Sequence, residues 1–190
     1  PQDMVEIFSR TVSLPAAEEG DAAIIAEPID FLGINNYTRI LVEASGSEDA
    51  FMGNPINPPD AEYTEMGWEV YPQGLYELLI RVHCDYGPLP LYITENGAAF
   101  PDELKKDGTI DDPRRINYLQ TYLLETWKAV EEGVPLKGYF VWTLMDNFEW
   151  AFGFSKRFGL IYVDYPTQKR YLKNSAHWYK KMISRNGLEA

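Results

Sequence analysis

Hydrophobic residues along the chain form short apolar runs that alternate with segments of helical periodicity. Residues 29–35, 89–94 and 138–144 are apolar runs of the length expected for buried strands. The run 138–144 is apolar on both faces, which predicts cover on both sides, as in a parallel sheet. Residues 1–28 lack a clear period, and Pro-punctuated stretches such as 15–19 are candidates for short helices.

Helices are predicted after each of the three strands. The first begins at Pro72, whose fixed φ suits a first helical turn, and ends at Gly87. The second has Asp112 as its N-cap and ends at Gly133. The third covers residues 174–184. The residues expected on the buried face of the second helix are Ile116, Leu119, Leu123, Leu124, Trp127 and Val130.

This alternation predicts an α/β fold with parallel strands. Polar and aromatic residues gather just after each strand: Asn35 and Tyr37, then Glu95 and Asn96, then Asp146, Asn147, Glu149 and Trp150. Because barrels of parallel strands build their sites at the carboxyl ends of the strands, this clustering indicates a functional site. Three strand–helix units cannot close an eight-stranded barrel, so open sheet edges are expected unless further chain covers them.

Composition and charge narrow the class of protein. The 190 residues are 45% apolar and contain no repeat or linker tract, so residues 1–190 are interpreted as part of one domain. A net charge of −12 disfavours nucleic acid and anionic membrane surfaces as partners. Cys84 is the single cysteine and only two histidines are present, so neither a disulfide nor a metal site is expected, and no cofactor is implied. No apolar run reaches the roughly 20 residues of a membrane helix, and no signal peptide opens the chain, which favours a cytoplasmic location.

Four motifs occur in a fixed order along the chain. They are Asp-Phe-Leu-Gly-Ile-Asn-Asn-Tyr at 30–37, Gly-Trp-Glu-Val-Tyr-Pro-Gln-Gly-Leu at 67–75, Ile-Thr-Glu-Asn-Gly at 93–97 and Trp-Thr-Leu-Met-Asp-Asn-Phe-Glu-Trp at 142–150, which 153–160 continues. Together they resemble the family 1 glycoside hydrolases, the β-glucosidase family. The resemblance implies a (β/α)8 TIM barrel, with this chain as its C-terminal part. It would supply roughly strands six to eight and the last two-fifths of the family's usual length.

The resemblance implies that Glu95 is the nucleophile of a retaining glycosidase. From spacing alone, a Glu before Asn-Gly is equally well a solvated turn residue. Tyr37 is implied to donate a hydrogen bond to that carboxylate, although an isolated Tyr at a strand end is more often a core aromatic. The family's acid/base Glu lies in an Asn-Glu-Pro motif, which this sequence lacks. An N-terminal part of the same barrel is therefore an expected partner.

Sugar contacts are implied for four residues near the C-terminal end of the third strand. Trp142 would be the stacking platform, because sugars present apolar C–H faces. Glu149 would accept hydrogen bonds from the 4- and 6-hydroxyls, and the Trp150 indole would donate one to the 3-hydroxyl. Phe158 would lie near the 6-hydroxyl. The alternative is that the tryptophans are core residues and Glu149 is a surface charge.

Two further residues match contact positions of the family. Asn35 would line the floor of the site, and Trp68 would stack on the leaving-group sugar or aglycone. A Trp at a loop-to-helix boundary is equally well a packing residue. Asp146 and Asn147 are interpreted as structural, tying the loop after the last strand through hydrogen bonds to the backbone.

The expected function is hydrolysis of β-glucosides, as oligosaccharides or aryl glycosides, with β-galactosides and β-fucosides as further candidates. Family members that act on 6-phosphorylated sugars have Ser where this chain has Glu149, and a carboxylate there would repel the phosphate. Lys156 alone does not restore such a site. The alternative from a different class is a sugar-binding or scaffold fragment without catalysis, because the acid/base is missing.

Overall fold

The computed structural model describes residues 2–44 and 53–188, which divide between two compact units. The first unit is built from the described residues of Pro1–Asp30 and Leu41–Ile56, and the second from those of Phe31–Ile40 and Asn57–Ala190. That residues 1–190 belong to one barrel domain stays a prediction, because contacts within this chain do not test it.

The first unit contains two short helices and a hairpin. The helices are α1 (Gln2–Ser9) and α2 (Asp21–Ile25), and the antiparallel hairpin pairs β2 (Leu41–Glu43) with β3 (Asn54–Ile56). The expectation of a helix at residues 15–19 is wrong, since residues 13–18 are irregular. The run between Pro15 and Gly20 is too short to nucleate a helix.

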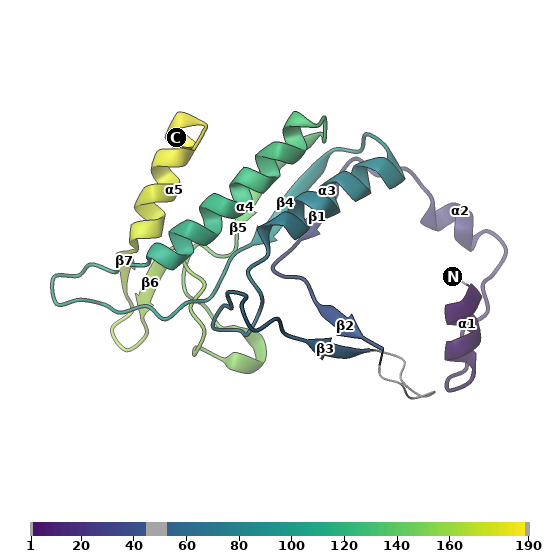
Figure 1. Ribbon diagram of the computed structural model, residues 1–190, viewed down its shortest axis with the longest axis horizontal. Helices are drawn as coiled ribbons and strands as arrows, with labels where there is room; N and C mark the ends of the chain where they lie inside the picture. The colour runs from purple at the N-terminus through teal and green to yellow at the C-terminus, as the bar shows by residue number, and fades with distance from the viewer. Residues whose placement is uncertain (1, 45–52, 189–190) are drawn as a thin grey trace. The chain divides into compact units, whose positions relative to one another are not determined.

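A parallel three-stranded sheet organises the second unit. Its strands are β1 (Leu32–Asn35), β4 (Leu91–Asn96) and β5 (Leu136–Val141), in the order β1-β4-β5. Helix α3 (Pro72–Tyr86) connects β1 to β4, α4 (Pro113–Glu131) connects β4 to β5, and α5 (Asn174–Arg185) follows (Figure 1). The predicted α/β architecture is therefore confirmed.

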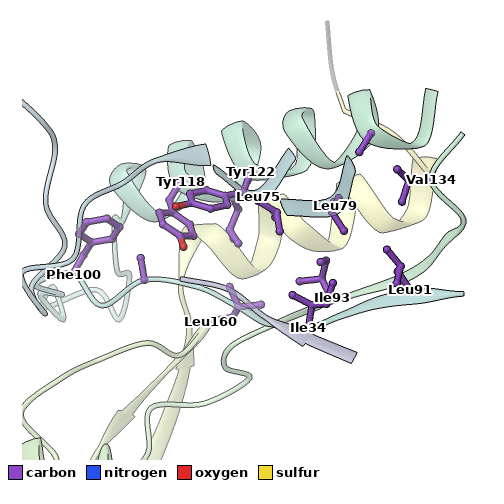
Figure 2. Close-up of a cluster of buried hydrophobic side chains, with 13 residues drawn as sticks. Ile34, Leu75, Leu79, Leu91, Ile93, Phe100, Tyr118, Tyr122, Val134 and Leu160 are labelled. Carbon is purple, nitrogen blue, oxygen red and sulfur yellow. The ribbon is translucent and has the colours of Figure 1, made fainter. Parts of the chain in front are cut away.

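The helices pack against one face of this sheet. Ile34 and Ile93 of the strands contact a cluster that includes Leu79 of α3 and Tyr122 of α4 (Figure 2). The predicted face of α4 is only partly confirmed: Leu119 is buried and Ile116 and Leu123 are half-buried, but the others are exposed, namely Leu124, Trp127 and Val130. The residues that are buried on this helix are Arg115, Tyr118, Leu119, Tyr122, Thr126 and Ala129.

The buried face of α4 is rotated by about one residue from the predicted one. Trp127, expected inside, is 56% exposed. The sequence pattern weighs apolar side chains and misses buried polar ones, yet Arg115, Tyr118 and Tyr122 find hydrogen-bond partners inside the fold. A polar group can be buried at little cost when it is paired in this way.

The third strand also departs from expectation. It runs to Val141 rather than Leu144, and Phe140 is 57% exposed, so the described residues cover one face of this strand and leave the second face open. Among the described residues of this unit, α3, α4 and α5 lie on one side of the sheet. Beyond β5 the chain forms a short 3-10 turn, η1 (Trp150–Phe152), and an antiparallel hairpin of β6 (Ile161–Asp164) and β7 (Lys169–Leu172), none of which the pattern indicates.

Asp112 occupies the predicted N-cap position of α4, but its side chain caps a different helix. It makes no cap hydrogen bond to α4. Instead its Oδ1 accepts a hydrogen bond from the backbone N–H of Ser175, in the first turn of α5, at 2.8 Å. It also pairs with Arg115, which is 1% exposed. The carboxylate thus joins two helices at their N-terminal ends.

A buried ionic cluster joins the loops that follow β4 and β5 to the start of α5. Lys173 Nζ donates to Asp102 at 2.6 Å and to Asp146 at 2.9 Å, and Arg115 also pairs with Asp102. Buried charges are tolerated only when they are paired in this manner. Within residues 2–44 and 53–188, no helix is long and apolar enough to cross a membrane.

Candidate active site

A cavity of about 440 Å³ lies at the carboxyl end of the sheet. Seven of the eight predicted site residues line it, all except Asn35. Its lining residues are Tyr37, Met66, Trp68, Glu95, Trp142, Glu149, Trp150, Ala151, Phe152 and Phe158. Segments far apart in the sequence therefore meet here, as the common direction of parallel strands requires.

Tyr37 and Glu95 are in direct contact within this cavity. The Tyr37 hydroxyl donates a hydrogen bond to Glu95 Oε2 at 2.7 Å. Burial, followed by the hydrogen bond to Glu95 and the charges of Glu95 and Glu149, raises the pKa of Tyr37 far above its ordinary value. The hydroxyl therefore keeps its proton and acts as a donor to the carboxylate.

The register of the sheet brings these two side chains together. Asn35 of β1 pairs with Glu95 of β4, after an irregularity that follows Ile34. The N–H of Asn36 donates to the carbonyl of Glu95 at 2.9 Å. Glu95 is thus the second-last residue of β4 and does not belong to the loop beyond it. A paired strand holds the side chain more rigidly than a loop would.

Gly97 explains why the motif ends in glycine. A Cβ at this position would lie 1.8 Å from the carbonyl oxygen of Trp142, so only glycine allows the two backbones to approach. The N–H of Trp142 donates to the carbonyl of Asn96 at 2.9 Å. This contact places Trp142 next to the strand that carries Glu95.

Glu149 presents an unusual carboxylate to the cavity. The residue is 9% exposed, and its Oε2 is buried without a hydrogen-bond partner among the described residues. The η1 turn holds its backbone, with the N–H of Glu149 donating to the Gly153 carbonyl at 2.7 Å. Next to it, Trp150 has a φ of 41°, which is uncommon for a residue with a side chain. A buried acceptor of this kind is suited to a ligand that brings hydrogen-bond donors.

Three aromatic rings form one wall of the cavity. The ring centroids of Tyr37 and Trp68 are 5.3 Å apart, and Phe158 lies 6.2 Å from Tyr37 and 6.1 Å from Trp68. Arg39 forms a two-pronged ion pair with Glu69, the residue after Trp68, at 2.7 and 2.8 Å. Such bidentate pairing fixes geometry, so the Trp68 segment is held against that of Tyr37.

Asn35 is the predicted site residue that does not line the cavity. Its Oδ1 accepts a hydrogen bond from the Thr94 hydroxyl at 2.7 Å. Asp146 is buried, accepts hydrogen bonds from the N–H of Gly159 at 3.0 Å and from Lys173, and lies outside the lining, in agreement with the structural interpretation.

Sequence reasoning missed the lining residues Met66, Ala151 and Phe152. Each lies within two residues of a predicted contact, Trp68 or Trp150, so proximity to a motif was the available signal. No cluster of three or more metal-ligating side chains occurs among the residues that the structure describes.

Comparison with known proteins agrees with the geometry of the cavity. A family-wide sequence profile described as "Glycosyl hydrolase family 1" matches residues 1–188. The chain is 49% identical to Beta-glucosidase A of Thermotoga maritima over 187 residues, which are 98% of this chain and 41% of that protein. It is 40% identical to a 6-phospho-beta-galactosidase of Lacticaseibacillus rhamnosus, covering 83% of this chain and 38% of that protein.

A solved structure gives the same result for the fold. The beta-glucosidase from Thermotoga maritima in complex with glucoimidazole is similar with a TM-score of 0.90 and 48% identity, over 99% of this chain and 41% of that one. The three parallel strands and their helices are thus part of a TIM barrel, as expected. The chain spans about two-fifths of the length of these relatives. It belongs to glycosyl hydrolase family 1.

Proposed function

We propose that the whole protein hydrolyses the β-glycosidic bond of β-glucosides by a retaining, two-step mechanism, with Glu95 as nucleophile. The observation that carries this proposal is the hydrogen bond from Tyr37 to Glu95 at the floor of an aromatic-walled cavity. The relative that contains glucoimidazole supports a glucose-shaped ligand. β-Galactosides and β-fucosides are further candidate substrates.

In the first step, a Glu95 carboxylate oxygen attacks the anomeric carbon while the bond to the leaving oxygen breaks, giving a covalent glycosyl-enzyme. The leaving oxygen takes a proton from an acid that the remainder of the barrel would supply. In the second step, water attacks the same carbon, passes its proton to that group, and Glu95 leaves. The Tyr37 hydroxyl orients the carboxylate before attack and donates a hydrogen bond to it again once Glu95 has been released.

The sugar would be held by the residues after β5. Trp142 would stack on the C–H face of the sugar, Glu149 would accept from its 4- and 6-hydroxyls, and the Trp150 indole would donate to its 3-hydroxyl. The unpartnered Oε2 of Glu149 supports this assignment. Phe158 would pack near the 6-hydroxyl, and Trp68 would contact the aglycone. Asn35 stays a predicted contact, through the floor of the site.

The charges around the cavity favour an unphosphorylated sugar, although one relative acts on phosphorylated galactosides by its name. The Glu149 carboxylate lines the cavity and would repel a phosphate dianion at close range. Lys156, the nearby cation, pairs with Glu65 at 3.5 Å, so part of its charge is already neutralised.

Covalent labelling tests the assignment of the nucleophile. The full-length protein is treated with a 2-deoxy-2-fluoro-β-glucoside bearing an activated leaving group, digested, and mapped by mass spectrometry. The label is expected on the peptide that carries Glu95. Fluorine at C2 slows both formation and hydrolysis of the glycosyl-enzyme, whereas the activated leaving group speeds formation alone, so the covalent intermediate accumulates.

Two variants complete this experiment. Glu95→Ala should lose turnover by at least about 10⁴-fold, the loss seen when a nucleophile is removed. Glu103→Ala, which changes an exposed glutamate in the loop after β4, should leave turnover within about 2-fold of the unmodified protein. A label on another peptide, or an active Glu95→Ala protein, would refute the proposal.

A further inference from the structure

A buried hydrogen-bond network lies directly behind the pair formed by Tyr37 and Glu95. Its members are Asn96, the residue after Glu95, and two tyrosines of α4, Tyr118 and Tyr122. We propose that these three are positioning residues, which hold Tyr37 in place so that its hydroxyl stays aimed at the nucleophile. This inference rests on the proposed function, since it concerns the reaction of Glu95.

Asn96, the last residue of β4, links the network to Asn36, which follows β1, and to β5. Its side chain is fully buried, and Nδ2 donates to the Asn36 carbonyl at 2.8 Å and to the Tyr118 hydroxyl at 3.1 Å. Its Oδ1 accepts from the hydroxyl of Tyr139 on β5. Asn36 is therefore held on two sides, because its N–H is also bonded to the carbonyl of Glu95. The residue after this clamp is Tyr37.

The two helical tyrosines converge on a single atom. The hydroxyls of Tyr118 and Tyr122 donate to the backbone carbonyl of Tyr37 at 3.2 and 3.3 Å. Their rings stack with centroids 4.2 Å apart, and Figure 2 shows them side by side within the buried cluster. Tyr122 also accepts a hydrogen bond from the N–H of Tyr71 at 3.2 Å.

Both hydroxyls keep their protons at ordinary pH, so each can donate to the Tyr37 carbonyl while it accepts from another group. Tyr118 and Tyr122 are 1% and 0% exposed, and burial raises the pKa of both. Their alternative interpretation is a pair of satisfied core tyrosines with no bearing on the reaction. The convergence of both donors on the carbonyl of Tyr37, whose own hydroxyl bonds to Glu95 at 2.7 Å, favours the positioning role.

The test measures glycosyl-enzyme formation in the full-length protein that carries both Tyr118→Phe and Tyr122→Phe. The phenylalanines keep the stacked rings and remove only the two hydroxyls. We expect the rate constant for labelling by the 2-deoxy-2-fluoro-β-glucoside to fall roughly 10-fold, because small misplacement of a reacting group is costly. The final extent of labelling per folded molecule should be unchanged. Tyr76→Phe is the matched control, since its hydroxyl joins α3 to Glu132 away from the cavity.

A double-mutant cycle separates positioning from structural support. In a Tyr37→Phe background the hydroxyl to be positioned is already gone, so removing the two helical hydroxyls should cost less than about 2-fold in labelling rate. An equal loss in both backgrounds, or a loss of less than about 2-fold in the unmodified background, would overturn the proposal. If the unmodified protein does not label at Glu95, the proposed function fails first, and this inference falls with it.

Discussion

Glu149 is a single residue at which the proposed sugar binding would act against the stability of the fold. Its Oε2 is buried and unpartnered among the described residues, a condition that costs folding free energy unless a ligand supplies donors. Neighbouring Trp150 adopts a φ of 41°, a second unfavourable feature in the same turn. Both features have an explanation if this turn binds the hydroxyl groups of a sugar, at a cost in stability.

Glu149→Gln should therefore move stability and affinity in opposite directions. Losing a buried charge without a partner is expected to raise the free energy of unfolding by about 1 kcal/mol. Losing charge-assisted acceptance from two sugar hydroxyls should raise KM for an aryl β-glucoside by about 10- to 100-fold. Steady-state kinetics and denaturant unfolding of the full-length protein measure both effects. Glu103→Gln is the control, and a drop in stability together with unchanged KM would contradict the prediction.

At the level of elements, the boundaries of the three long helices were more predictable than the buried face of α4. Pro72 and Gly87 mark α3 correctly, because a fixed φ and a glycine with φ of 80° act locally. The buried face of α4 depends on partners elsewhere in the fold, such as Asn96 for Tyr118 and Asp102 for Arg115, which no local pattern reveals.

The candidate site was predicted through motifs rather than through periodicity. Helical and strand periods place Glu95 near a strand end, but they do not place it opposite Tyr37, 58 positions away. The resemblance to a family supplied that pairing. It did not supply Met66, Ala151 or Phe152, because apolar lining residues in irregular loops carry no motif of their own.

The buried tyrosines of α4 predict how stability depends on alkaline pH. Their pKa values are raised in the folded state, whereas an unfolded tyrosine titrates near its ordinary value of 10.0. Above pH 10 the unfolded chain therefore binds fewer protons than the folded one. The stabilising contribution is present in full below that pH and is lost as pH rises, by about 1.4 kcal/mol per pH unit for each tyrosine.

Denaturant unfolding of the full-length protein between pH 9 and pH 11.5 measures this slope. The variant that carries Tyr118→Phe and Tyr122→Phe should show a shallower decline, because two titrating groups have been removed. Tyr76→Phe, whose raised pKa comes mainly from its hydrogen bond to Glu132, serves as the surface comparison. An identical slope in the unmodified protein and in the α4 variant would show that these tyrosines ionise equally in both states.

At the level of the whole molecule, the second unit presents surfaces that a barrel would cover. The outer strands β1 and β5 each pair on one side only within the described sheet, and large apolar side chains on β5, in the loop after it, on β7 and on α5 are exposed. They are Phe140, Leu144, Leu172 and Ile183. Unpaired strand edges with apolar neighbours favour association with another segment. The matched region is 41% of the chain in the related structure, so most of that barrel is formed by residues that have no counterpart in this chain.

Activity should depend on the part of the barrel that supplies the proton. Protonation of the leaving oxygen by a general acid contributes typically 10²–10⁴-fold, about the loss expected without it. Residues 1–190 alone should therefore turn over an unactivated aryl β-glucoside at least about 100-fold more slowly than the same residues combined with an N-terminal part of the barrel. Release of the phenol measures turnover for the chain alone, for the N-terminal part alone and for the mixture.

The mixture made with Glu95→Ala should stay inactive, because both carboxylates are needed in one site. Comparable turnover by residues 1–190 alone would show that a second carboxylate within this chain, such as Glu149, can donate the proton, and would overturn the proposed division of the reaction.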